Sequence, residues 1–204
     1  QLKDHDKTIK KFKEENSGPL TIVFNSESSP GGILNKLQSE VTIKAGGKHD
    51  PQHPLSSLIA FDEDEYFINS FNYKPKSIVD VFIQFDFGPT KRVDPISYFI
   101  KSGNISAFQK HPRSWAIDAS NDGSIWKVID KRFDDSTLRG DIYTGLFKIK
   151  NTIVNSGTKG FRYIRFIQNN SWMNGHPYMI NLTYFEIYMA LYMIQIFKGV
   201  CFFL

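Results

Sequence analysis

The chain has 204 residues and a formal net charge of +4; 41% of its residues are hydrophobic and 23% are charged. This composition excludes a wholly disordered chain, and the length fits one domain with extensions. The small, diffuse positive charge does not by itself indicate a nucleic-acid partner. The single cysteine, Cys201, excludes an internal disulfide and a cysteine metal cluster.

Residues 1–16 are charged throughout and are expected to form a helix. Leu2 and Ile9 stand seven residues apart, a spacing that fits the end of a coiled coil entering from upstream sequence. A solvated, fraying helix is the alternative for so short a segment. The segment has no apolar run of the kind found in signal peptides. Residues 17–40 are then expected to be a linker, which begins with the helix-breaking Ser17-Gly18-Pro19 and contains a short helix over 33–37.

Most of the chain from residue 20 to residue 188 is predicted to form short β-strands, and residues 41–188 are predicted to be the folded domain. Runs rich in β-branched and aromatic residues alternate with Gly, Asn and Asp turn formers. No long helices stand between these runs, a pattern typical of an antiparallel sandwich or barrel. The predicted strands are 20–24, 41–45, 77–87, 95–102, 114–120, 126–130, 145–149, 161–168 and 182–188.

The segment 115–123 has the clearest local pattern. In residues 115–119 the odd positions are apolar and are predicted to face a core, whereas Asp118 is expected to face water. Ser120-Asn121-Asp122-Gly123 predicts a hairpin turn between two runs that each carry a tryptophan, with Gly123 supplying the positive φ angle.

Residues 189–204 form an almost wholly apolar tail. With Lys198 inside it, the tail falls short of the roughly 20 apolar residues that a membrane-spanning helix needs. Three interpretations stay open: a tail that is not native because the gene model is wrong, a further strand or helix packed on the sandwich, or a membrane anchor. Contact with a membrane is expected only if the tail is native sequence.

No arrangement of residues in the sequence predicts catalysis, so we expect a protein that is not an enzyme. The sequence has no Walker loop, dinucleotide fingerprint, serine nucleophile elbow or paired-histidine metal motif. His49 and His53 are four residues apart, but the prolines around them prevent a helix that would place both on one face. The GxxG run at 157–160 lacks the helices of a nucleic-acid-binding module, and no nucleic-acid partner is expected.

The run Asp62-Glu63-Asp64-Glu65 is a candidate for metal binding. Carboxylate oxygens on a loop suit Ca²⁺, but the EF-hand spacing is missing. A solvated acidic turn is the alternative.

The most specific pattern lies in residues 111–130, where Ser114-Trp115, an alternating strand, the Ser120–Gly123 turn, Trp126 and Asp130 follow one another. This stretch resembles the signature of the discoidin family, the coagulation factor V/VIII type C domain. Segments that line up with the family in the same order are 82–87, 98–102, 138–140 with Phe147, 161–165 and 184–188. The resemblance implies an all-β fold: an antiparallel eight-stranded jelly-roll-like β-sandwich of the galactose-binding-like type, here with a short N-terminal helix.

The chain is most similar to the version of this domain that follows BTB and coiled-coil regions in intracellular proteins of unicellular eukaryotes. Extracellular members usually join their ends by a disulfide, which the single Cys201 does not permit. We therefore expect an intracellular, cytoplasmic protein, with the cell surface as the alternative, and an oligomer formed through an upstream coiled coil. The chain departs from the family at Phe82, where a Trp is common, and at Met189, where the closing strand usually runs into Gly.

The resemblance implies a non-catalytic binding module that presents ligand-binding loops at one end of the sandwich. A protein partner is expected in preference to a glycan or an anionic lipid, and an extracellular or surface carbohydrate- or lipid-binding domain is the alternative. The candidate loops are 46–57, 69–76, 103–113 and 171–178, and their candidate contacts are His49, His53, Tyr73, Lys76, Phe108, Lys110, His111, Arg113, Trp172, His176 and Tyr178.

Two further expectations concern this end of the domain. Trp172 is either a ligand contact or a core residue that closes the sandwich, since Trp is highly buried on average. The family sometimes holds a structural ion near its early acidic loop. The resemblance therefore implies Asp62, Asp64 and Glu186 as the residues that would bind Ca²⁺, and no other cofactor is expected.

Overall fold

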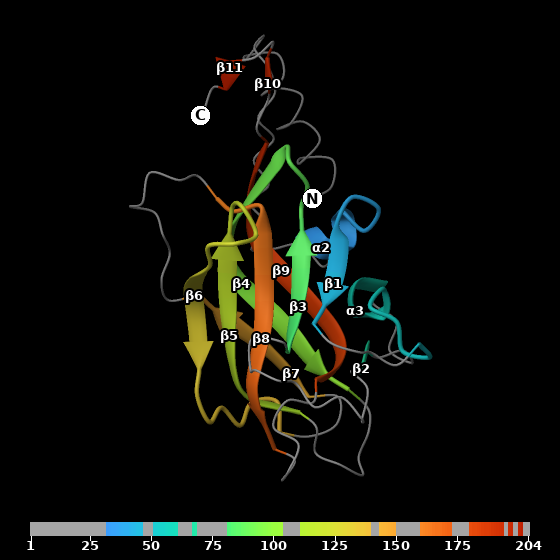
Figure 1. The fold of residues 1–204 in the computed structure, drawn as a ribbon. Helices are drawn as coiled ribbons and strands as arrows, with labels where there is room; N and C mark the ends of the chain where they lie inside the picture. Colours follow the sequence, from blue (N-terminus) through green and yellow to red (C-terminus); the bar gives the residue numbers. More distant parts are fainter. Residues whose placement is uncertain are drawn as a thin grey trace, which may run out of the picture.

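Two antiparallel β-sheets lie face to face with a hydrophobic core between them (Figure 1). This arrangement confirms the predicted all-β sandwich, because each sheet buries one face against the other. The computed structural model describes residues 32–46, 51–60, 67–68, 81–103, 111–139, 143–149, 160–172, 180–193, 196–197 and 200–201.

Among the described residues the first sheet has five strands and the second has four, and every pair within them is antiparallel. Eight of these strands have four residues or more, in agreement with the expected eight-stranded sandwich. The five-stranded sheet has the order β1 (Thr42–Ala45), β3 (Phe82–Asp86), β8 (Tyr163–Ser171), β5 (Pro112–Ser120) and β6 (Lys127–Arg132). The four-stranded sheet has the order β2 (Phe67–Ile68), β9 (Asn181–Met193), β4 (Lys91–Ser102) and β7 (Thr144–Lys148).

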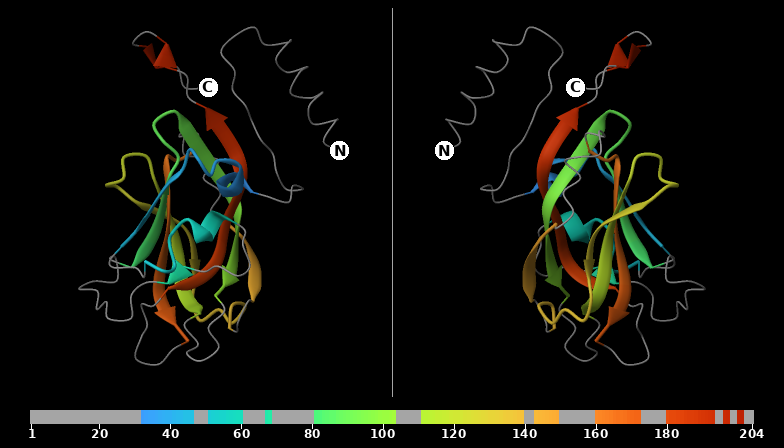
Figure 2. Two further views of the ribbon diagram at one scale, coloured as in Figure 1. Left: turned by 90° about the vertical axis from the view of Figure 1, so that its right-hand side faces the viewer. Right: turned by 90° about the vertical axis from the view of Figure 1, so that its left-hand side faces the viewer.

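Two one-turn helices, α2 (Ile33–Lys36) and α3 (Ser57–Ala60), contact β9 (Figure 2). Their larger apolar side chains, which are those of Ile33, Leu34, Leu58 and Ile59, are buried and belong to the same core as the two sheets, whereas Ala60 is exposed. The helix predicted at 33–37 is confirmed. The sequence did not predict α3, because one helical turn is too short to show a hydrophobic period.

Strands β4 and β9 are both longer than predicted. They pair along nearly their whole length, from Ser102 opposite Leu182 to Lys91 opposite Met193, so each strand extends the other. The first residues of the apolar tail, as far as Met193, therefore continue the closing strand. Beyond it, β10 (Ile196–Phe197) pairs with β11 (Val200–Cys201). The predicted helix at 1–16 and the predicted strand at 20–24 lie outside the described residues.

In the parts of the chain that the structure describes, no helix combines the length and the apolar character needed to cross a bilayer.

The alternation predicted for residues 115–119 is confirmed on the core face, where Trp115, Ile117 and Ala119 are buried. The expectation that Asp118 faces water is wrong, because its side chain is only 8% exposed. In the antiparallel register Asp118 stands opposite Arg165, and the two form an ion pair of 3.0 Å. The indole of Trp126 lies over the Arg165 guanidinium at 3.8 Å, and this stack covers the pair.

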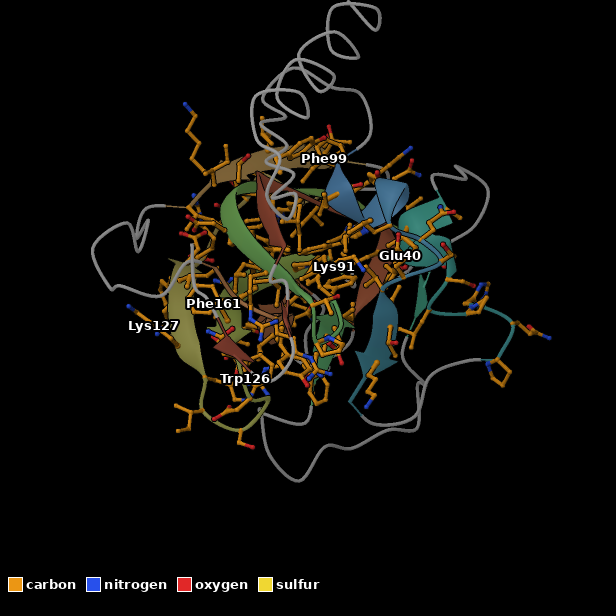
Figure 3. The ribbon with its side chains drawn as sticks, turned by 90° about the horizontal axis from the view of Figure 1, so that it is seen from above. Glu40, Lys91, Phe99, Trp126, Lys127 and Phe161 are labelled. Atoms are coloured by element: carbon orange, nitrogen blue, oxygen red, sulfur yellow. The ribbon has the colours of Figure 1, made fainter. Side chains whose placement is uncertain are left out.

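The predicted turn after β5 is confirmed. The Ser120 Oγ accepts the amide of Gly123 at 3.0 Å, and the Asp122 Oδ1 accepts the amides of Ser124 and Ile125 at 2.8 Å. Gly123 has a φ of +74°, which a residue with a Cβ adopts only with strain. Seen along the sandwich axis from this end, Trp126 and Lys127 lie on the five-stranded sheet and Glu40 lies beside Lys91, its ion-pair partner (Figure 3).

An ion pair with two parallel hydrogen bonds joins β3 to the start of β8. The Arg162 Nε donates to the Asp86 Oδ1 at 2.8 Å and its Nη2 donates to the Oδ2 at 2.9 Å. Burial alone would raise the pKa of Asp86. The hydrogen bonds from Arg162 and the Gly88 amide, together with the Arg162 charge, have the larger effect, so the pKa lies below its ordinary value of 3.8. The ionised carboxylate therefore stabilises the fold above that pH.

Asp86→Asn is expected to lower the free energy of unfolding by about 2 kcal/mol at pH 7, the usual size for hydrogen bonds to a charged group. Because the folded-state pKa is lowered, the wild type loses this contribution as the pH falls through that pKa, whereas the variant has none to lose. Urea unfolding at pH 7 and at pH 2.5 measures the difference between the two proteins. An equal difference at both pH values would show that the carboxylate charge is irrelevant.

Candidate ligand-binding end of the sandwich

The described strands before and after the four candidate loops end or begin at the same end of the sandwich, which we call the loop end (Figure 1). At this end β1, β4, β6 and β8 finish and β3, β5, β7 and β9 begin. The register shows the neighbours there: Ala45 is opposite Ile83, and Ser171 is opposite Pro112. In proteins generally, loops carry binding residues more often than the strands that position them.

Several of the predicted contacts lie outside the described residues: His49, Tyr73, Lys76, Phe108, Lys110, His176 and Tyr178, as well as Asp62 and Asp64. The structure describes His53, His111, Arg113, Trp172 and Glu186. His53 is half-buried and precedes α3. The other three loop residues lie together at the start of β5 and the end of β8.

The centre of this group is Trp172, which follows β8. Its backbone amide donates to the His111 carbonyl at 3.1 Å, and this bond fixes the end of β8 beside the start of β5. Two guanidinium groups lie over its half-buried indole: that of Arg113 at 4.6 Å and that of Arg139 at 4.4 Å from the ring centroid. We call these three side chains the Arg–Trp–Arg stack.

Arg139 was not among the predicted contacts, because it comes from the connection between β6 and β7 and not from the four candidate loops. Its amide donates to the Ser136 carbonyl at 3.0 Å, and its neighbour Leu138 is fully buried. This anchoring places the Arg139 guanidinium over Trp172. The only signal in the sequence was the segment 138–140, which resembles the segment before the late strands of the discoidin family.

Asp134 is the second residue of the site that the sequence did not predict. Its carboxylate forms an ion pair with the Arg113 Nε, and its amide donates to the Ser114 Oγ at 3.0 Å. The hydrogen bond from Arg113 holds the pKa of Asp134 below its ordinary value. Asp134 has a φ of +50°, the left-handed region that Asp tolerates better than most residues. The turn after β6 is thus held against the stack.

Glu186 is the one described residue of the expected Ca²⁺ site, which stays a prediction because Asp62 and Asp64 lie outside the described residues. Its Oε1 accepts the amides of Leu34 and Ile187 at 2.7 and 2.8 Å. Its Oε2 accepts the Asn35 amide at 3.1 Å and the Tyr184 hydroxyl at 2.9 Å. The carboxylate is completely buried and serves the first turn of α2. Among the described residues, no group of three or more His, Cys, Asp and Glu side chains is placed to hold a metal ion.

No protein-family model matches the chain, and no curated protein matches its sequence. Solved structures match it at the level of the fold. The C-terminal domain of a chitobiase from Bacteroides fragilis has a TM-score of 0.54 at 12% identity, over 75% of this chain and 95% of that chain. The family 32 carbohydrate-binding module of NanJ from Clostridium perfringens, solved in complex with galactose, has a TM-score of 0.50 at 14% identity, over 76% and 95%.

A family 89 glycoside hydrolase from Clostridium perfringens also matches, with a TM-score of 0.52 at 17% identity. The match covers 74% of this chain but only 14% of the hydrolase. At these identities the likeness establishes the fold alone. It confirms the predicted class, a galactose-binding-like β-sandwich.

Proposed function

We propose that the protein is a non-catalytic binding module whose loop end binds a protein partner. The observation that carries this proposal is the Arg–Trp–Arg stack. A sugar ring that stacks on tryptophan needs a bare indole face, whereas two guanidinium groups cover the indole of Trp172. Trp and Arg held together at a surface are the residue types that dominate the energy of protein interfaces.

Carbohydrate binding is the second candidate function. It is supported by the fold shared with the NanJ module, whose structure contains galactose. In that case the guanidinium groups of Arg113 and Arg139 would donate hydrogen bonds to sugar hydroxyls. A glycan array and vesicles of phosphatidylcholine with phosphatidylserine test the sugar and the anionic-lipid alternatives directly, and we expect neither to bind the full chain.

We further propose that the module works inside the cell, behind an oligomerising coiled coil. The single cysteine and the heptad-like spacing at the start of the chain support this setting. Sequencing of full-length transcripts tests it, because a BTB or coiled-coil region upstream would agree with it and a signal peptide would contradict it.

Trp172→Ala is expected to leave the domain folded and to weaken partner binding at least tenfold, since the indole is half-buried and organises both arginines. Trp126→Ala is the matched control, because Trp126 also stacks on an arginine but lies at the opposite end. We expect proteins retained by the immobilised wild type to be retained by Trp126→Ala and lost from Trp172→Ala. If Trp172→Ala unfolds by circular dichroism, Trp172 is a core residue and the assignment fails.

A further inference from the structure

The turn that follows β6 presents Phe133 to solvent beside the Arg–Trp–Arg stack. Its side chain is 85% exposed, compared with 78% for Ile125 and 62% for Leu146, the next most exposed large apolar residues described. A single exposed apolar residue is ordinary on a protein surface. Phe133 differs because the chain on both of its sides is held in place.

On the preceding side, Arg132 is tied to both sheets. Its Nε donates to the Asp130 Oδ2 at 2.8 Å, and its Nη2 donates to the Lys148 carbonyl at 2.7 Å. On the following side, Asp134 is held by Ser114 and Arg113, as described above. The backbone of Phe133 is therefore already ordered in the free protein, so little backbone entropy is lost when a partner binds.

The charges around Phe133 indicate what a partner must supply. Asp134 already neutralises Arg113, and the Asp135 carboxylate accepts the Thr137 amide at 2.9 Å. Among the described residues, no carboxylate forms an ion pair with Arg139, which is exposed. A partner that covers the surface gains most by offering an apolar pocket and one carboxylate.

We propose that Phe133 is the anchor of the interface: its ring enters an apolar pocket of a protein partner, and a carboxylate at the rim of that pocket pairs with Arg139. This inference rests on the proposed function and names the chemistry of its partner. An anionic membrane fits this surface less well, because the half-exposed Asp134 carboxylate stands next to Phe133 and would be repelled by the headgroups.

The test is photo-cross-linking from the anchor position in the full chain, expressed in its source cells. The variant Phe133→p-benzoylphenylalanine is compared with Ile125→p-benzoylphenylalanine, which is nearly as exposed but lies at the opposite end. We expect one protein to be cross-linked from position 133 and not from position 125. Mass spectrometry of the cross-linked peptides is expected to place an Asp or Glu of the partner next to the attachment point.

Binding measured with that purified protein then gives the effect of each residue. Phe133→Ser is expected to raise Kd at least 30-fold, and Ile125→Ser less than twofold. Arg139→Glu is expected to raise Kd at least tenfold, and replacing the partner's carboxylate by Lys is expected to restore part of the loss. Because Phe133 is exposed, Phe133→Ser should melt within about 2 °C of the wild type.

The outcomes separate the anchor from the proposed function. If Trp172→Ala weakens binding and Phe133→Ser does not, the loop end binds the partner but Phe133 is not the anchor. If neither variant changes binding, both proposals fall. Cross-linking from position 133 to lipid, or binding to phosphatidylserine vesicles that Phe133→Ser abolishes, would assign the anchor to a membrane and overturn the protein pocket.

Discussion

Replacing Trp115 by alanine is expected to lower the free energy of unfolding by about 4 kcal/mol, a large part of the total stability of an ordinary domain. Trp115 is fully buried on β5, and its ring packs edge-on against Phe147 with centroids 5.1 Å apart. Its Nε1 donates to the Tyr98 hydroxyl at 2.9 Å, which in turn donates to the Asp130 Oδ2 at 2.7 Å. The substitution thus opens a cavity and breaks a buried link between the two sheets.

Thermal unfolding measures this effect, and a fall in Tm of roughly 8–16 °C is expected for a chain of this size. Trp126→Ala is the control, because Trp126 is only half-buried on the outer face of the sheet; we expect it to cost no more than about 2 kcal/mol. Tyr98→Phe separates the hydrogen bonds from the packing and should cost about 1–3 kcal/mol, since it leaves the Trp115 N–H without its acceptor. Equal losses for the two tryptophan variants would contradict this assignment of the core.

The same segment shows what a sequence reveals and what it does not. The core face of residues 115–119 and the turn at Ser120–Gly123 were predictable because they depend on period-two alternation and on turn chemistry, both of which are local. Asp118 was predicted wrongly because its environment is set by Arg165, 47 residues away in the sequence. A polar residue on the outer face of a strand is exposed only if nothing covers it, and here Trp126 contributes the cover.

The ends of strands were also hard to predict, because they depend on pairing with distant residues. Strand β4 was predicted to begin at Pro95, a residue that removes a donor from the strand ladder. The strand in fact begins at Lys91, and the register with β9 shifts between Pro95 and Ser97. A bulge of this kind lets a proline stand inside a paired strand. No property of residues 91–94 alone predicts that β9 continues far enough to pair with them.

The residues of the candidate site likewise fall into those that the sequence predicted and those that it did not. Arg113 and Trp172 were predicted, because aromatic and basic residues in loops are visible in a sequence. Arg139 and Asp134 were not, because only the folded chain shows that the connection from β6 to β7 passes between the two sheets at the loop end. Their contacts cross 33 residues from Arg139 to Trp172 and 21 residues from Arg113 to Asp134, distances that no short motif spans.

The buried carboxylate of Glu186 gives the second large expected effect. At pH 4.5 and below, Glu186→Gln is expected to lower the free energy of unfolding by about 3 kcal/mol. Both carboxyl oxygens can accept hydrogen bonds, here from three backbone amides and one hydroxyl, whereas the NH₂ of glutamine accepts none. Gly32→Ala tests the same contact between α2 and the Glu186 side chain, here by a change in α2. A Cβ at Gly32 would stand 2.2 Å from the Glu186 Cγ, so α2 would have to move away from β9.

The pH dependence of stability shows how much of the effect of Glu186 depends on the protonation of its carboxyl group. Burial raises the pKa of Glu186 above its ordinary 4.5, although hydrogen bonds from Ile187, Leu34, Asn35 and Tyr184 lower it. A raised pKa in the folded state means that the stabilising contribution is complete below the unfolded-state pKa and is lost as the pH rises through the folded-state value.

The difference in unfolding free energy between the wild type and Glu186→Gln should therefore shrink from pH 4.5 upward, because the glutamine does not titrate. Urea unfolding between pH 4 and pH 8 measures it. Glu40→Gln is the matched control, since Glu40 is half-exposed and pairs with Lys91 at the surface; its effect should stay within about 0.5 kcal/mol at every pH. A difference that grows with pH would mean that the four donors outweigh burial, and that α2 is held by an ionised carboxylate.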